Sequence, residues 1–246
     1  MTGKTLKNFI LTSEVFVFLL ICTICVIGFL NTQDFDEYLE FGCCALRCLT
    51  LLFFVFFFYS SLFSGLGTDS SFLPLFILFS TVGELRILPL FSKVTNLCPY
   101  NPGTVSSIIV FSYIFSGFCL FCFGFFYQDR EQSSVNIFLF LTLSASVLLA
   151  AMLPGTQDIE KIAYSIPFSV LLACIYACAA AVFLYNITAD PPGTYLIRHI
   201  AALLFIAANI ANLYLDSRMA ILGSTAFTLV SYVSVIVISA VSDIKY

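Results

Sequence analysis

The chain has 246 residues, of which 61% are hydrophobic and only 10% charged, with a formal net charge of −4. Soluble domains carry roughly 45–50% apolar and about 25% charged residues, so this composition indicates a polytopic membrane protein. A basic footprint for nucleic acid is absent, which excludes nucleic acid as a partner.

Eight apolar segments follow one another along the chain, each of the roughly 17 to 25 residues needed to cross a bilayer. Charge, proline and glycine gather in the short connections between them. The sequence therefore predicts an all-α fold, a polytopic transmembrane helical bundle of about eight spans that forms one integral-membrane domain over residues 1–246. The expected spans are residues 9–30, 42–66, 72–91, 105–127, 135–153, 164–186, 195–215 and 219–241.

Basic residues in the connections indicate the orientation. The first segment is too long for the hydrophobic part of a signal peptide, so we expect it to be retained as a span. With the N-terminus inside, five basic residues lie on the cytoplasmic side and three on the other, which favours cytoplasmic N- and C-termini. The five are Lys4, Lys7, Arg130, Arg198 and Lys245, and the three are Lys93, Lys161 and Arg218.

The ten cysteines lie almost wholly inside the apolar segments. Thiolates are costly in hydrocarbon, and a zinc site needs four ligands. We interpret the cysteines as small hydrophobic residues. The sequence predicts neither a metal centre nor a cofactor.

The third apolar segment contains an acid, Glu84, in the stretch FLPLFILFSTVGELRILPLF. A carboxylate at this depth is costly when ionised and unpaired, so such acids are paired, protonated or turned towards a protein interior. Ser80 lies one helical turn before it, and Arg86 lies two residues after it on another face. Two interpretations remain open: a functional site, or a structural ion pair with Arg86 or Arg47.

The seventh segment carries a row of polar residues. Asn209, Asn212 and Asp216 are spaced i, i+3 and i+7, so they share one helix face. The row predicts either an asparagine pair that bonds across a tight helix interface or the polar wall of a cavity inside the membrane. Two amides leading to a carboxylate favour the cavity.

Three other polar residues lie at the ends of apolar segments. Arg47, on the second segment, either reaches the interface or supplies a cation to Glu84 or to a lipid phosphate. We expect Glu14 and the single histidine, His199, at the membrane interface. Because no serine-hydrolase, zinc-protease or phosphate-loop motif is present, acid chemistry at Glu84 is the catalytic hypothesis that remains.

These residues resemble the motifs of the YhhN family, the lysoplasmalogenases, which are eight-span membrane proteins. LFSTVGELRIL (Leu78–Leu88) is similar to that family's LFSxxGDxxL signature. LLFIAANIANL (Leu203–Leu213) is similar to LLFxxSDxxLA. Arg47-Cys48-Leu49 resembles the KCLP segment on the second span, Gly117 and Phe121 fit GxxxF…H on the fourth, and Tyr232 matches a tyrosine on the last.

The chain also departs from the family pattern. Glu84 stands where the family has Asp, and Asn209 stands where it has a second Asp. Phe125 replaces a histidine, and Arg47 replaces a lysine. A glutamine near the end of the last span is replaced as well.

The resemblance implies hydrolysis of the vinyl-ether bond of lysoplasmalogens, which yields an aldehyde and a glycerophospho-base. Two carboxyls suit this reaction, one as proton donor and one as the anion that stabilises the oxocarbenium-like cation and orients water. In this chain Glu84 would donate the proton and Asn209 would position the water. The residues expected to bind the membrane lipid are Arg47, Ser80, Asn212, Asp216 and Tyr232.

The departures leave two further hypotheses open. The chain could be a non-catalytic relative that binds, senses or transports lipid while keeping the bundle, since one fold hosts several functions. Alternatively, it could be a proton-coupled transporter that uses Glu84 as a relay.

Overall fold

The computed structural model describes residues 3–57, 72–97, 100–126, 132–153, 165–189, 194–213 and 218–243. Within these ranges the regular elements are all helical, which confirms the predicted all-α bundle. The helices are α1 (Gly3–Asn31), α2 (Phe35–Phe57), α3 (Phe72–Gly83), α4 (Leu88–Thr95), α5 (Pro102–Phe125), α6 (Gln132–Met152), α7 (Ile166–Ala189), α8 (Thr194–Leu213) and α9 (Arg218–Asp243).

Several helices are long and apolar enough to cross a membrane. Among the described residues there are five such segments, namely Asn8–Asn31, Phe35–Phe56, Phe72–Thr95, Pro102–Phe125 and Ile166–Ala189. The other three predicted spans fall on α6, α8 and α9, where the described apolar stretches are shorter. Large apolar side chains also cover the outside of the bundle, as at Phe16 and Leu30, which are 68% and 78% exposed. Such a surface is typical of helices that face lipid.

The second helix begins earlier than the predicted span 42–66, at Phe35. The Asp34 carboxylate accepts a hydrogen bond from the Asp36 amide at 3.2 Å. An acidic cap and acidic residues in the first turn favour a helix start at this point, although they are too polar for an apolar span. Residues 58–66 of that prediction lie outside the described residues.

A proline explains the break between α3 and α4. The four residues Glu84–Ile87 form a 3-10 turn between these helices. Pro89 has no amide proton, and its ring would clash with the Leu85 carbonyl of a continuous α-helix. The Leu88 amide donates to that carbonyl instead, as in a 3-10 helix. The break therefore places Glu84 at a change of helical pitch near the middle of the segment.

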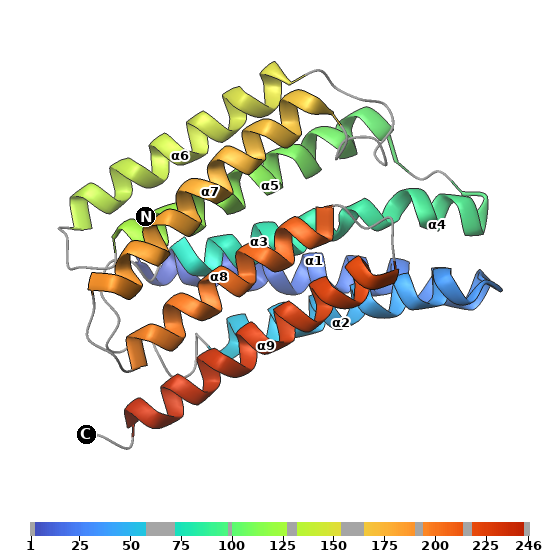
Figure 1. Cartoon of the computed structure of the whole chain (residues 1–246). Helices are drawn as coiled ribbons and strands as arrows, with labels where there is room; N and C mark the ends of the chain where they lie inside the picture. The colour runs from blue at the N-terminus through green and yellow to red at the C-terminus, as the bar shows by residue number, and fades with distance from the viewer. Residues whose placement is uncertain are drawn as a thin grey trace.

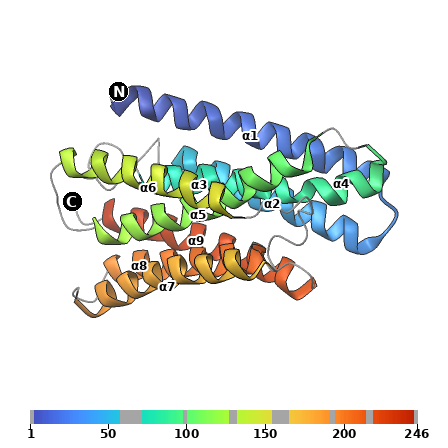
Figure 2. The same cartoon turned by 90° about the horizontal axis from the view of Figure 1, so that it is seen from above.

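The helix α3 is the centre of the bundle, with ten of its twelve residues buried. It packs against α5 on one side and against α1 and α2 on another, while α8 packs closely on α9. Figure 1 shows α3 and α4 running end to end through the middle of the bundle. From above, α1 lies at one edge and α7 and α8 at the opposite edge (Figure 2).

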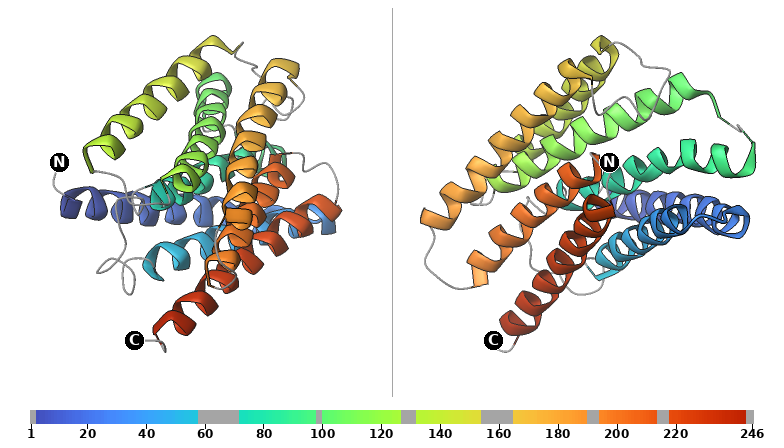
Figure 3. Two further views of the ribbon diagram at one scale, coloured as in Figure 1. Left: turned by 60° about the vertical axis from the view of Figure 1, so that its left-hand side comes forward. Right: turned by 45° about the vertical axis from the view of Figure 1, so that its right-hand side comes forward.

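Two glycines let α5 approach α7 closely. A Cβ atom on Gly117 would lie 2.7 Å from the Ile175 side chain, and one on Gly124 would lie 3.0 Å from Phe183. These positions are seven residues apart and so share one face of α5. Small residues at such a contact are typical of helices that pack inside membranes. Figure 3 shows α5 between α6 and α7.

Candidate functional site

A buried ion pair joins the second and third predicted spans. Arg47 on α2 donates from Nε to Glu84 Oε1 at 2.9 Å and from Nη2 to Glu84 Oε2 at 2.8 Å. Both side chains are only 3% exposed. The contact is the two-pronged arrangement in which a planar guanidinium matches a carboxylate. Of the two arginines considered from the sequence, Arg47 is therefore the partner.

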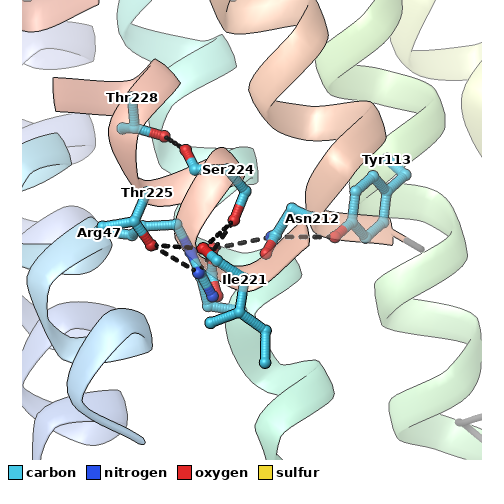
Figure 4. Close-up of polar contacts among 8 residues, drawn as sticks. Arg47, Tyr113, Asn212, Ile221, Ser224, Thr225 and Thr228 are labelled. Atoms are coloured by element: carbon cyan, nitrogen blue, oxygen red, sulfur yellow. Dashed lines mark hydrogen bonds and ion pairs between the residues drawn. The ribbon is translucent and has the colours of Figure 1, made fainter. Parts of the chain in front are cut away.

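The remaining guanidinium nitrogen of Arg47 reaches α9. Nη1 donates to Ser224 Oγ at 3.2 Å and to Thr225 Oγ1 at 3.1 Å. Each hydroxyl in turn donates to the Ile221 carbonyl, at 3.0 Å and 2.9 Å. Figure 4 shows these bonds converging beside Arg47. The guanidinium thus lies inside the bundle, not at the interface that one interpretation expected.

An asparagine connects the ion pair to α5. Asn212 Nδ2 donates to Glu84 Oε1 at 2.8 Å and to the Tyr113 hydroxyl at 3.2 Å. Asn209 is directed differently, because its Nδ2 donates to the Phe205 carbonyl of its own helix at 3.2 Å. The two asparagines of one predicted face therefore have separate roles, and only Asn212 bonds the carboxylate.

A small cavity lies against the ion pair. It offers about 20 Å³ to the centres of water-sized molecules, which is room for one or two waters. Two polar atoms near it, Ser80 Oγ and Asn212 Oδ1, are buried without a hydrogen-bond partner among the described residues. Its lining residues are Arg47, Leu51, Phe76, Ser80, Glu84, Phe205, Ala208, Asn209, Asn212 and Thr228.

The structure brings most of the predicted site residues together, but not all. Arg47, Ser80, Glu84, Asn209 and Asn212 line the one cavity. Among the remaining two, Tyr232 is half-buried, and its ring packs 5.7 Å from that of Phe54. Tyr232 is not among the cavity-lining residues. Asp216 lies outside the described residues.

Sequence reasoning missed the hydroxyl groups that complete the site. Tyr113 on α5 was not singled out, and neither were Ser224, Thr225 and Thr228 on α9. The last segment did contain a signal, because hydroxyl residues recur one turn apart within an otherwise apolar stretch. On α5, serines and one tyrosine interrupt the apolar run without such a clear period, so Tyr113 carried no comparable signal.

Two residues that we expected at the membrane interface pack inside the bundle. Glu14 is fully buried, and its Oε1 lies 2.6 Å from the Thr81 hydroxyl on α3. His199 is 1% exposed, with its ring 6.0 Å from that of Phe183. Position near a segment's end did not reveal which way these side chains turn.

The ion pair limits the chemistry available at Glu84. Both carboxylate oxygens accept hydrogen bonds from Arg47, an arrangement that favours the ionised acid. An ionised Glu84 can stabilise a cation or orient water, but it has no proton to donate. Among the described residues, no group of three or more His, Cys, Asp or Glu side chains is arranged to hold a metal ion.

No family model matches the chain, and the searches of curated proteins and of solved structures likewise give no match. The resemblance to the YhhN family rests on the short motifs alone and stays a prediction.

Proposed function

We propose that this chain is a multi-pass membrane protein that binds the polar part of a single-chain ether lipid, as a non-catalytic relative of the YhhN family. The observation that carries the proposal is the cavity beside the ion pair, where Ser80 Oγ and Asn212 Oδ1 have hydrogen-bonding capacity that no described residue uses. Buried polar atoms are normally satisfied, so such atoms mark a place for water or ligand. By the distribution of basic residues, both termini would be cytoplasmic.

The size and lining of the cavity indicate which part of a lipid would enter. One or two waters fit, and a glycerol hydroxyl or ether oxygen that displaces them is of similar size. Leu51, Phe76 and Phe205 form an apolar side next to the polar groups. This combination suits the junction between a glycerol unit and an alkyl chain. The rest of the lipid's alkyl chain would lie among the helices or in the surrounding bilayer.

Binding is favoured over hydrolysis because the proton donor is missing. Glu84 is held by Arg47 through both oxygens, and Asn209 is an amide that cannot act as a general base. Glu84 is the only carboxylic acid among the described residues that line the cavity. A mechanism that needs two carboxyl groups therefore lacks the second one at this cavity.

The binding test compares two variants of neighbouring residues. Purified protein in detergent is titrated with a lysoplasmalogen, and binding is followed by native mass spectrometry. Ser80→Ala removes a hydroxyl that lines the cavity, so affinity should fall by up to about tenfold, the value of one hydrogen bond. Tyr232→Phe is the matched control and should bind like wild type. Equal binding by Ser80→Ala and wild type would contradict the proposal.

Hydrolysis is a second candidate, favoured by one observation. The water-sized space lies against both the Glu84 carboxylate and Asn209. In that version a water molecule in this space would supply the proton to the vinyl carbon, Glu84 would be the anion that stabilises the resulting oxocarbenium-like cation, and the asparagines would orient the water that adds to it. Aldehyde release from lysoplasmalogen tests it directly. Release that Glu84→Gln abolishes would support hydrolysis, whereas bound lipid that keeps its ether bond would support binding alone.

A further inference from the structure

A second buried acid among the described residues, Glu14, lies apart from the lipid site. It is on α1, its side chain is fully buried, and α1 packs against α3. Its Oε1 is 2.6 Å from Thr81 Oγ1, and its Oε2 is buried without a partner among the described residues. The residues that line the cavity do not include it.

The hydroxyl of Thr81 has two neighbours but one proton. Its Oγ1 lies 2.6 Å from Glu14 Oε1 and 3.1 Å from the Ile77 carbonyl oxygen, both of which are acceptors when the acid is ionised. A threonine hydroxyl donates once and accepts through its lone pairs. Either Thr81 donates to Glu14, or it donates to Ile77 and accepts a proton from a neutral Glu14.

Other threonines of the same bundle indicate which alternative holds. The hydroxyl of Thr225 also has two neighbours: it donates to the Ile221 carbonyl one turn back and accepts from Arg47 Nη1. Thr50, Thr95 and Thr228 also donate to the carbonyl four residues earlier, at 2.7–2.8 Å. If Thr81 uses its proton in this way, the group at 2.6 Å must be the donor, which requires a protonated carboxyl on Glu14.

The charges around Glu14 lead to the same conclusion. Among the described residues, Glu14 has no ion-pair partner, and its one side-chain hydrogen bond is with Thr81. Glu84, the acid on the adjoining 3-10 turn, is paired with Arg47. An ionised Glu14 would therefore be an unpaired charge in an apolar interior, which is strongly unfavourable, whereas a neutral acid needs no cation.

We infer that Glu14 is a proton-binding site, held as a neutral carboxylic acid that donates to Thr81. Within this bundle, proton uptake and release then belong to Glu14 and not to Glu84, whose oxygens are engaged by Arg47. The inference does not depend on lipid binding at the cavity. It also assigns a modification site, because apolar carbodiimides react with protonated carboxyls inside membranes. The acid protonates a carbodiimide nitrogen, and its oxygen adds to the central carbon to give an O-acylisourea, with no leaving group.

Infrared spectroscopy of the purified protein at neutral pH is the direct test. Wild type should show the carbonyl band of a protonated carboxylic acid, Glu14→Gln should lose it, and Glu84→Gln should keep it. Thr81→Val removes the acceptor and should shift the band to higher frequency. A wild-type spectrum without the band, or a Glu14→Gln spectrum that retains it unchanged, would overturn the inference. Glu14→Gln preserves shape and neutrality, so it should fold.

Chemical labelling gives a second readout. Protein in phosphatidylcholine vesicles is treated with dicyclohexylcarbodiimide, and the adducts are located by mass spectrometry. The adduct should be on Glu14, and Glu84 should stay unmodified in wild type. Arg47→Leu frees Glu84 from its cation and is the positive control for reagent access. An adduct on Glu84 alone in wild type, or an unmodified Glu14 beside a labelled Glu84 in Arg47→Leu, contradicts the inference.

Discussion

The two buried acids beside α3 meet the same physical problem in different ways. Glu84 follows α3, and its carboxyl group accepts two hydrogen bonds from Arg47 and a third from Asn212, which together favour the charged form. Glu14 faces Thr81 on α3 and has no charged partner among the described residues. A carboxyl inside an apolar bundle is thus stabilised either by a complete set of donors or by its own proton.

The difference follows from what each neighbouring helix supplies. The side of Glu84 faces α2, α8 and α9, which contribute a guanidinium, an amide and hydroxyls. Glu14 lies on α1, where the other large buried side chains that the structure describes, Ile10, Ile21 and Cys25, are apolar. A site for a polar lipid group needs several such groups, so of these two regions the one around Glu84 has the composition of a ligand-binding site.

Removal of Arg47 should have the largest effect on the free energy of unfolding. Arg47→Leu leaves Glu84 buried without its cation, and breaking a buried pair from one side typically costs about 3–5 kcal/mol. The free energy of unfolding in detergent measures the loss. The double variant Arg47→Leu/Glu84→Leu should recover most of it, because an apolar replacement of both partners is often neutral. A single variant as stable as wild type would mean that the pair is not formed.

The substitution Asn212→Leu should cause the second largest loss in the free energy of unfolding. It removes a hydrogen bond to the Glu84 carboxylate and another to the Tyr113 hydroxyl. Hydrogen bonds to charged groups contribute about 1.5–3 kcal/mol, so a loss in this range is expected in the same unfolding measurement. Asn209→Leu is the matched control, since among the described residues Asn209 bonds a carbonyl of its own helix and not the acid. Equal losses in both variants would show that the bond to Glu84 has no special weight.

The sequence predicted the acid and much of its surroundings. Apolar lengths gave the all-α bundle, and the spacing of Asn209 and Asn212 placed both beside one cavity. Helical period alone could not tell which of them bonds the acid, because this depends on how α8 rotates against α5. The α2 start was missed since its first turn is acidic and capped by Asp34.

Side-chain direction is the part that the sequence could not supply. Glu14 and Arg47 lie in spans with apolar residues on every face, so periodicity does not distinguish a lipid-facing position from a protein-facing one. Position along the span suggested the interface for Glu14, yet packing of α1 against α3 buries it. Such directions come from contacts between helices that are distant in sequence.

The hydroxyl groups near the two acids should differ in how much they contribute to stability. Thr81→Val should cost about 0.5–1.5 kcal/mol, the contribution of a neutral hydrogen bond. The double variant Ser224→Ala/Thr225→Val should cost about 1.5–3 kcal/mol, since it leaves Arg47 Nη1 without both of its acceptors. Unfolding of both variants in one detergent measures the difference. A loss at Thr81 as large as that on α9 would indicate a charged group at Glu14.

The smallest effect is expected for Glu14→Gln, and it separates the two regions most directly. The amide of Gln can still donate to Thr81 and still offers an oxygen, so the change in unfolding free energy should be below the roughly 0.5–1.5 kcal/mol of one neutral hydrogen bond. Glu84→Gln is the same chemical change at the other acid, but it leaves Arg47 buried without an anion and should cost about 3–5 kcal/mol. If the two substitutions cost the same, Glu14 is ionised and the contrast between a paired and a protonated carboxyl is wrong.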